Sequence, residues 1–279
     1  MDFTIKKRDP FSNKGNYGRV CIVGGSNGMC GSVYLASMAA LRCGSGLVYT
    51  IVPEIISEIM QIKSVENIIL PLECEEKKLS ANSIFQILEY ISNKNCVAIG
   101  CGMGKDKLNY ELIKSVLKNF HKPVLIDADG LNSIKDFCEL EFEDYSVAIT
   151  PHPLEFSRLS GLDVEYINQN REKVASDFSK KHKCIVVLKG HHTIVAKNDE
   201  IYVNNTGNAG MATAGSGDCL SGIIASFMHN RDVFEACKLG VYIHGLAGDF
   251  AKQKIGEDSI IASDIIRNLP EAINACKEK

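Results

Sequence analysis

The chain has 279 residues, of which 45% are hydrophobic and 23% charged, so it is long and apolar enough to bury a full globular core. Its formal net charge of −3 gives no electrostatic bias toward nucleic acid or a membrane surface, and it has no tryptophan for a base-stacking platform. No apolar run reaches the ~20 residues of a membrane-spanning helix, and Met1–Asp9 lacks the apolar core of a signal peptide.

Short apolar runs alternate with helical patterns along most of the chain. The strands expected from these runs are Arg19–Val23, Leu47–Val52, Cys96–Gly100, Pro123–Asp127, Ser146–Thr150 and Cys184–Leu188. The patterns between them are a helix over Val33–Arg42, the amphipathic run Ser83–Ile91 and a helix over Leu108–Asn119. This alternation predicts an α/β fold with a mostly parallel central sheet and helices on both of its faces.

The pattern changes after residue 192. Thr193–Ala196 and Ile201–Val203 flank a polar turn, which predicts a β-hairpin. The final third is expected to be helical over Cys219–Met228, Val233–Phe250 and Ala262–Lys279, with a break in the last helix at Pro270. No linker, repeat or low-complexity segment interrupts the chain, so we expect residues 1–279 to form a single domain.

The eleven cysteines are scattered, odd in number and never spaced as C-x-x-C. Several lie in apolar runs, including Cys21, Cys96 and Cys184, where a thiol packs as a small core side chain. This pattern argues against a disulfide framework or a zinc site and favours the reducing cytoplasm.

The most informative segment is Asn205–Asp218, which is rich in glycine and other small residues and precedes an apolar helical run. Backbone amides in such a segment can approach a ligand closely, and the start of a helix favours negative charge. The carboxylate of Asp218 stands at the same helix start and can accept a proton from a hydroxyl group. The combination indicates phosphoryl transfer to an alcohol.

Two further glycine turns follow predicted strands. Gly24–Gly28 lacks the G-x-G-x-x-G spacing of a dinucleotide fingerprint, so a Rossmann oxidoreductase is poorly supported. Gly100–Gly104 has glycines that would let a flat ligand lie against bare backbone. Each turn is equally compatible with an ordinary tight connection between a strand and a helix.

Polar side chains follow three other predicted strands. Open parallel sheets bind their ligands at the carboxyl ends of their strands. Asp127 is expected to take part in a site, whereas Asp129 is expected to cap the following turn. His152 lies between two prolines that stiffen its backbone, and we expect it to contact a ligand. Glu155 is one helical turn away and would hold water on a metal ion or favour the helix dipole.

The segment Lys189–Thr193 joins a strand to the predicted hairpin. Lys189 could meet a phosphate as a point charge, and Thr193 could donate its hydroxyl. His191 and His192 are adjacent, and neighbouring residues on a strand point to opposite faces, so a shared metal ion is disfavoured.

These motifs, in this order, resemble the ribokinase-like fold, a three-layer αβα sandwich, and more narrowly the ADP/ATP-dependent NAD(P)H-hydrate dehydratase family. The similarity runs from Lys14–Arg19 to Leu269–Pro270, and its most specific part is Thr206–Asp218. The order of Thr150–Pro153, Leu188–Gly190 and Tyr242–Gly245 adds to it. The resemblance implies repair of hydrated NADH or NADPH, with ADP or ATP as co-substrate and Mg²⁺ as cofactor.

The resemblance also implies roles for individual residues. Asp218 is the catalytic base, and we expect the helix start to keep it ionised. The hydrated nicotinamide nucleotide is implied to contact Ser32, Gly102, His152 and Asp218. The adenine nucleotide is implied to contact Lys189, Gly190, His191, His192, Thr193 and Gly217. The anion hole comprises Ala214, Gly215, Ser216 and Gly217, and Glu155 is the metal candidate, acting through water.

The chain departs from the family pattern at several points. It has Cys30-Gly31-Ser32 where Pro-Gly-Ala is usual, and Cys101 and Ala209 where proline is common. Ala214 and Ser216 replace the more usual glycine and threonine, whereas the Gly-x-Gly-Asp end is intact. His152 in place of the asparagine of wider ribokinase relatives, with Glu155 retained, suits the dehydratase branch.

The family's partner is an epimerase that is sometimes fused at the N-terminus, and 279 residues leave no room for it, so we expect a separate epimerase. The resemblance also suggests a homotetramer.

Two alternatives remain open at this stage. A ribokinase-like kinase of a small alcohol would use the same loop and base but retain the phosphate in its product. A non-catalytic nucleotide sensor would bind without turnover, although it would need no base at Asp218.

Overall fold

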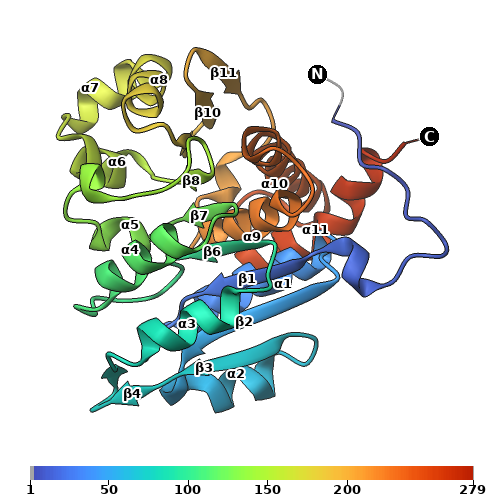
Figure 1. The fold of residues 1–279 in the computed structure, drawn as a ribbon. Coiled ribbons are helices and arrows are strands. Elements are labelled where there is room, and N and C mark those ends of the chain that lie inside the picture. The colour runs from blue at the N-terminus through green and yellow to red at the C-terminus, as the bar shows by residue number, and fades with distance from the viewer. Residues whose placement is uncertain (1–2, 279) are drawn as a thin grey trace.

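The computed structural model describes residues 3–278, and its centre is a nine-stranded sheet (Figure 1). All neighbouring strands are parallel except β10, which runs antiparallel to both of its neighbours. The order across the sheet is β11 (Glu200–Val203), β10 (Ile194–Lys197), β9 (Ile185–Leu188), β8 (Val147–Ile149), β7 (Val124–Ile126), β6 (Cys96–Ile99), β1 (Arg19–Val23), β2 (Leu47–Pro53) and β3 (Ile68–Leu72). A separate short hairpin pairs β4 (Cys74–Glu75) with β5 (Lys78–Leu79).

The central strands are apolar throughout because both faces of the sheet are covered. In β1, Val20 and Ile22 belong to one hydrophobic core, whereas Cys21 and Val23 belong to the other. This division follows from the alternation of side chains along a strand. The two cores therefore define two helical layers with the sheet between them.

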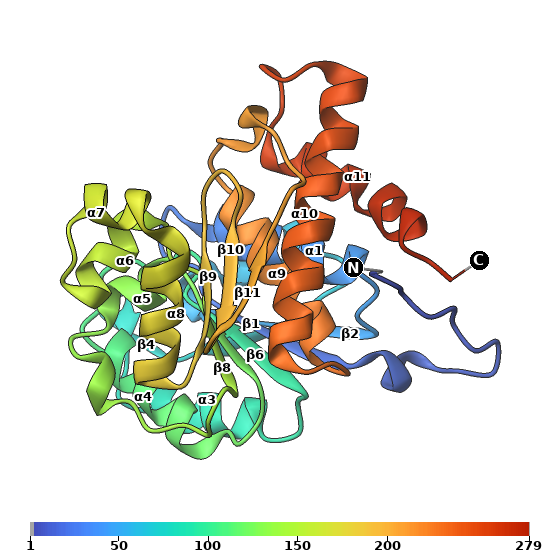
Figure 2. The same ribbon diagram turned by 90° about the horizontal axis from the view of Figure 1, so that it is seen from above.

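Figure 2 shows these layers on the two sides of the sheet. One layer contains α1 (Cys30–Arg42), α2 (Ser57–Lys63), α9 (Ser216–Met228), α10 (Val233–Ile255) and α11 (Ala262–Ala275). The other contains α3 (Ser83–Ile91), α4 (Asn109–Asn119), α5 (Asp129–Ser133), α6 (Pro153–Ser160), α7 (Val164–Gln169) and α8 (Arg171–His182). The predicted α/β architecture with helices on both faces is confirmed.

Each predicted strand and the hairpin are present within one or two residues of their expected bounds. The predicted break at Pro270 is wrong, since α11 continues through that residue to Ala275. Pro270 is exposed, while Leu269 and Ala272 are fully buried, so packing of α11 against α10, α1 and α9 holds the helix despite the missing amide. The sequence analysis assigned no element to β3, α2 or α6–α8.

All eleven cysteines lie in the described part of the chain, and within residues 3–278 no two of them form a disulfide. Within residues 3–278, no helix combines the length and apolarity needed to cross a bilayer. The carboxyl ends of the parallel strands β1, β6, β7, β8 and β9 meet at one edge of the sheet, which is where the sequence motifs converge.

Candidate active site

The start of α9 forms an open anion-binding terminus. Gly215 precedes the helix with φ of +87°, a left-handed conformation that favours glycine, and no side chain caps this end. The first amide to bond within the helix is that of Cys219, which donates to the carbonyl of Gly215 at 3.0 Å. The amides of Gly217 and Asp218 therefore have no acceptor in the helix and, with the helix dipole, favour an anion.

The loop that leads to α9 is held by α10. Asp249 accepts hydrogen bonds from the Gly207 amide and the Asn208 side chain, both at 2.9 Å. The hydroxyl of Thr206 donates to the carbonyl of Tyr242, also at 2.9 Å. These contacts fix the loop in front of the helix and explain why the Tyr242–Gly245 motif accompanies the glycine-rich segment.

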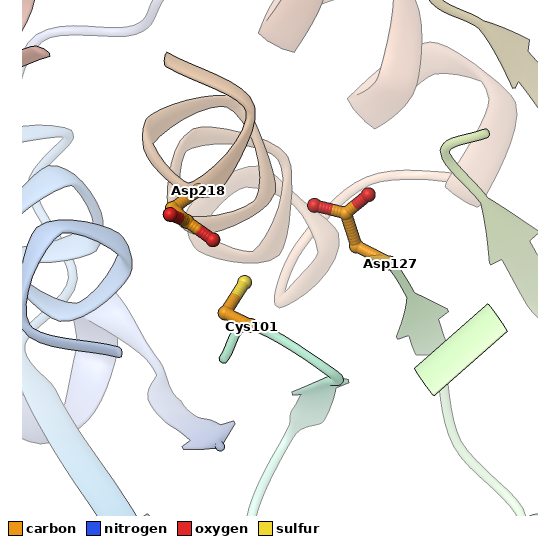
Figure 3. A group of neighbouring side chains, drawn as sticks. All are labelled: Cys101, Asp127 and Asp218. Carbon is orange, nitrogen blue, oxygen red and sulfur yellow. The ribbon is translucent and has the colours of Figure 1, made fainter. Parts of the chain in front are cut away.

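Asp218 is the third residue of α9, and its side chain points toward Cys101 and Asp127 (Figure 3). One ligand atom from each of the three residues lies within 4.8 Å of the others. Cys101 follows β6 and Asp127 follows β7, so two neighbouring strand ends and a helix start build the cluster. The sequence analysis missed Cys101 as a member of this cluster and treated it only as a departure from the family pattern.

The environment of Asp218 raises the pKa of its carboxyl group above the ordinary value. Burial is the main cause, followed by the negative charge of Asp127, whereas hydrogen bonds from Cys101 and Ser32 and the charge of Lys189 act in the opposite direction. The expectation that the helix start keeps Asp218 ionised finds no support here, because the helix start is not among the causes of this shift and the net pKa is raised. A carboxylate with a raised pKa is a stronger base than an exposed aspartate.

The carboxylate of Asp127 is almost completely buried and fully partnered. Its Oδ1 accepts from Lys189 Nζ at 2.7 Å, and its Oδ2 accepts from the Ser221 hydroxyl at 2.7 Å. Burial pushes the pKa of Lys189 down, but Asp127 and Glu155 outweigh it and the pKa is raised, so the ammonium is charged. The thiol of Cys101 stays protonated because burial and Asp218 raise its pKa. The cluster is thus suited to proton transfer rather than to thiolate ligation of a metal.

Lys189 also connects the cluster to the anion site. A side-chain carbon placed at Gly217 would lie 3.5 Å from Lys189 Nζ, with nothing else within 4 Å. The structure therefore places Lys189 beside Gly217 and Asp218, which follow each other in the sequence. A phosphate in this space would meet both amides and an ammonium group.

The expectation that Asp129 caps the next turn is wrong. Asp129 is itself the first residue of α5, and Ala128 precedes the helix without a side-chain hydrogen bond. The Asp129 carboxylate instead accepts from the Gly104 amide at 2.8 Å, which ties the Gly100–Gly104 turn to the end of β7. A side-chain carbon at Gly100 would lie 1.9 Å from the Asp127 carbonyl, so only glycine allows this close packing.

His152 and Glu155 form a reciprocal cap at the start of α6. The ring Nδ1 of His152 accepts from the amides of Leu154 and Glu155, both at 3.2 Å, and Glu155 Oε2 accepts from the His152 amide at 2.8 Å. Glu155 Oε1 lies 3.5 Å from the ring Nε2, and Lys189 Nζ lies 3.8 Å from Oε2. Glu155 therefore helps to cap α6 and lies near Lys189, and its contact with Mg²⁺ through water remains a prediction.

Gly190–Thr193 form the turn between β9 and β10. His191 and His192 are exposed there with ring centroids 3.9 Å apart, so the premise that they lie on a strand and face opposite ways is wrong. The Thr193 hydroxyl donates to the Gly190 carbonyl at 3.0 Å. Arg171, which the sequence analysis missed, donates to the Leu188 carbonyl at 2.9 Å and packs against Gly190, so it anchors the start of this turn.

Ser32 and Gly102 lie together on the other side of Asp218. Ser32 is in the first turn of α1, and a side-chain carbon at Gly102 would lie 2.9 Å from its Cβ. Beyond them, a cavity of about 680 Å³ opens between the turns that follow β1 and β6. Asp218 therefore has Lys189 and Ser32 as neighbours, and Ser32 packs against the Gly100–Gly104 turn that borders the cavity.

His244 is a further site neighbour that the sequence analysis quoted only as part of a motif. Its Nε2 lies 3.3 Å from the hydroxyl of Ser216, the first residue of α9. Burial lowers the pKa of His244 to about 4, so the ring is neutral at physiological pH. No pattern local to Ser221, Arg171 or His244 signals these contacts, because each depends on how distant elements pack.

The fold and the site define a ribokinase-like α/β protein in which a carboxylate stands beside an anion-binding helix start. Solved ribokinase-like proteins share this fold. The model of the NAD(P)H-hydrate dehydratase family matches residues 20–271. The chain belongs to the NAD(P)H-hydrate dehydratase family.

Individual relatives agree with this assignment. The bifunctional NAD(P)H-hydrate repair enzyme Nnr of Moorella thermoacetica is 36% identical over 99% of this chain and 53% of its own length. The ADP-dependent (S)-NAD(P)H-hydrate dehydratase of Neisseria meningitidis is 36% identical over 90% of this chain and 83% of its own. The chain thus spans about half the length of the bifunctional relatives it matches.

A solved structure extends the similarity to three dimensions. The ADP/ATP-dependent NAD(P)H-hydrate dehydratase of Bacillus subtilis, co-crystallised with ATP and Mg²⁺, superposes with a TM-score of 0.82. It is 25% identical and the match covers 98% of this chain and 95% of that one.

Proposed function

We propose that this protein is a nucleotide-dependent (S)-NAD(P)H-hydrate dehydratase, which uses ADP or ATP to restore NADH or NADPH from their hydrates. The observation that carries the proposal is the position of Asp218 in the first turn of α9, beside two unpartnered amides and Lys189. Phosphoryl transfer needs a base for the attacking hydroxyl and positive charge around the moving phosphate. Both lie within one turn of a helix.

The adenine nucleotide would bind on the side of Asp218 bordered by Lys189, Gly190, His191, His192 and Thr193. Its terminal phosphate would lie against the turn of Ala214 and Gly215 and the first residues of α9, Ser216 and Gly217. The hydrated nicotinamide would approach from the other side, past Ser32 and Gly102, with His152 at its edge. Asp218 then faces both reactants.

The reaction follows from this placement. Asp218 accepts the proton of the ring hydroxyl, and the hydroxyl oxygen forms a bond to the terminal phosphorus of the nucleotide as the bond to the departing nucleotide breaks. The carbon–oxygen bond then breaks with both electrons going to the departing phosphate, while the ring nitrogen donates electrons to the carbon. Loss of a proton from the neighbouring ring carbon restores the dihydropyridine. Phosphorylation is needed because hydroxide is a poor leaving group.

Magnesium bound to the nucleotide would neutralise charge on the phosphates during the transfer. Among the described residues, Glu155 would contact it through water. Lys189 and the amides of Gly217 and Asp218 supply the protein's own positive charge at the same place. Asp127 holds Lys189 there through its buried ion pair.

Incubation of hydrated NADH or NADPH with ADP or ATP and Mg²⁺ tests the proposal. We expect the reduced-nicotinamide absorbance to return with release of one inorganic phosphate per dinucleotide. A kinase of a small alcohol would leave the phosphate on its product, and a nucleotide sensor would bind without turnover. Nucleotide binding without recovery of absorbance would reject the dehydratase.

We further propose that the chain acts as a single domain and a cytoplasmic homotetramer and relies on a separate epimerase to convert the other diastereomer. The support is the family resemblance. Light scattering would give the oligomeric state. Turnover of a mixed-epimer substrate should stop at the S fraction and resume only when an epimerase is added.

A further inference from the structure

None of the residues assigned a role in the proposed reaction lines the cavity of about 680 Å³. It is lined by the turn after β1, by the end of β2, by the β4–β5 hairpin and by the loop that precedes α4. Its volume is within the range of roughly 300–1,000 Å³ typical of small-molecule sites. Neither the phosphate-binding terminus of α9 nor Lys189 contributes to its walls.

The cavity and the base are linked by the residues packed between them. Gly102 packs against Ser32 and Met29, and Ser32 faces the Asp218 carboxylate. Met29 and Gly104 are themselves part of the cavity wall. A molecule whose reacting group lies at Asp218 and whose other end occupies this space would have to cross the Gly100–Gly104 turn, which borders both.

The rim of the cavity is strongly basic although the whole chain carries a net charge of −3. Lys77 and Lys78 come from the hairpin, and Lys105 and Lys107 come from the loop before α4. Asp106 is the one carboxylate among the lining residues. Within residues 3–278, no acidic side chain forms an ion pair with any of the four lysines.

The single lining carboxylate serves to hold the rim together. Asp106 Oδ1 accepts from the Leu108 amide at 2.9 Å, and its Oδ2 accepts from the Leu79 amide at 3.2 Å. This bridge joins the loop to the hairpin, so that all four lysines border the same opening. An anion in the cavity would meet their combined positive field.

We propose that this cavity binds the phosphate-bearing adenosine half of the hydrated dinucleotide, and that Lys77, Lys78, Lys105 and Lys107 make NADPH-hydrate the preferred substrate over NADH-hydrate. The inference rests on the proposed function. NADPH differs from NADH by a 2′-phosphate on the adenosine ribose, far from the reacting ring. Only a site away from Asp218 can distinguish the two, and the lysine-rimmed cavity, whose walls do not include Asp218, is such a site.

The lysines are exposed, so each contact with a phosphate is screened by water and salt. Replacing one pair of them with glutamine should lower kcat/KM for NADPH-hydrate by about tenfold, equivalent to about 1.4 kcal/mol. The loss should be smaller for NADH-hydrate, which lacks the 2′-phosphate. It should also appear mainly in KM, because the lysines do not contact the reacting ring.

The test compares kcat/KM for the two hydrates in the wild-type protein and in two variants, K77Q/K78Q and K105Q/K107Q. The control K180Q/K183Q removes the same charge from exposed lysines on α8 and the turn after it. We expect the wild type to favour NADPH-hydrate, the two cavity variants to lose that preference, and the control to keep it. The KM for ADP should not change in any of them.

An unchanged preference in both cavity variants would overturn the inference. A raised KM for ADP without a change for the hydrates would place the other nucleotide in the cavity and overturn it as well. If neither hydrate is turned over, the proposed function fails separately. Fluorescence titration with NADPH and NADH then still decides the inference. Tighter binding of NADPH than of NADH by the wild type, lost in the two cavity variants, would support it. Equal binding of the two dinucleotides by the wild type would reject it.

Discussion

The replacement Gly217→Ala separates the stability of α9 from its proposed use as a phosphate site. Gly217 is the second residue of the helix, and an added methyl group would meet only Lys189 Nζ at 3.5 Å, an ordinary contact distance. The protein should therefore fold normally. The methyl group would, however, occupy the space in front of the amides where a phosphate must lie.

The two effects have opposite signs. Alanine is a better helix residue than glycine and restricts the unfolded chain, so the variant should gain about 0.5 kcal/mol and melt ~1–2 °C higher. Loss of one preorganised donor to a transferring group typically costs ~10²–10³ in kcat. Displacement of the phosphate from the Gly217 and Asp218 amides should produce a loss in this range.

The assays are thermal unfolding and steady-state turnover of hydrated NADPH with ADP. Gly222→Ala in the same helix is the matched control, because its methyl group would lie 1.9 Å from the Ala36 carbonyl of α1. It should destabilise the protein by ~1–3 kcal/mol while the folded fraction keeps a normal nucleotide KM. If Gly217→Ala retains normal kcat and KM, phosphate does not lie against residue 217 and the assignment of the anion site is wrong.

Three other changes probe the surrounding charges. Lys189→Ala should raise the nucleotide KM more than it lowers kcat, and a kinetic loss confined to kcat would contradict this. The same variant should lose about 3 kcal/mol of stability in urea unfolding, because it leaves Asp127 buried without its counter-ion. Asp127→Asn removes a negative charge that raises the pKa of Asp218, so the acidic limb of the pH profile of kcat/KM should move to lower pH. A shift to higher pH would refute the coupling between Asp127 and Asp218. His244 has a pKa of about 4 in the folded protein against an ordinary 6.5, so the free energy of unfolding should fall by up to ~3 kcal/mol as the pH drops from 6.5 toward 4. In urea unfolding, the stability of His244→Gln should depend less on pH than that of the wild type. An equal dependence in the two proteins would exclude His244 as its cause.

The sheet and its layers could be predicted because each strand is a short apolar run with a clear end. The predicted bounds of Arg19–Val23 match β1, and Cys184–Leu188 differs from β9 by a single residue. The strand β3 was missed because Ile68–Leu72 contains Pro71 and lies at an edge of the sheet, where proline is tolerated. The predicted helix break at Pro270 was wrong because the packing of the neighbouring side chains outweighs the tendency of proline to end a helix.

The motifs of the site could be named from the sequence, but not their contacts. Charge at strand ends predicted that Asp127 and Lys189 belong to one edge of the sheet, and the glycine-rich segment predicted Asp218 at a helix start. The ion pair of Lys189 with Asp127 and the hydrogen bond from Ser221 depend on which strands are neighbours and how α9 packs on them. The lysine-rimmed cavity was missed for the same reason, since Asp106 joins two segments whose proximity no local pattern reveals.

The role of Asp218 as the base that activates the ring hydroxyl is tested most directly by single-turnover kinetics of Asp218→Asn. The variant is isosteric, so nucleotide binding should be kept while the joint appearance of inorganic phosphate and reduced nicotinamide slows by ~10²–10⁴. The wild-type protein should release both products together in equal amounts. Near-normal turnover by the asparagine variant, with nucleotide bound as in the wild type, would contradict the assignment.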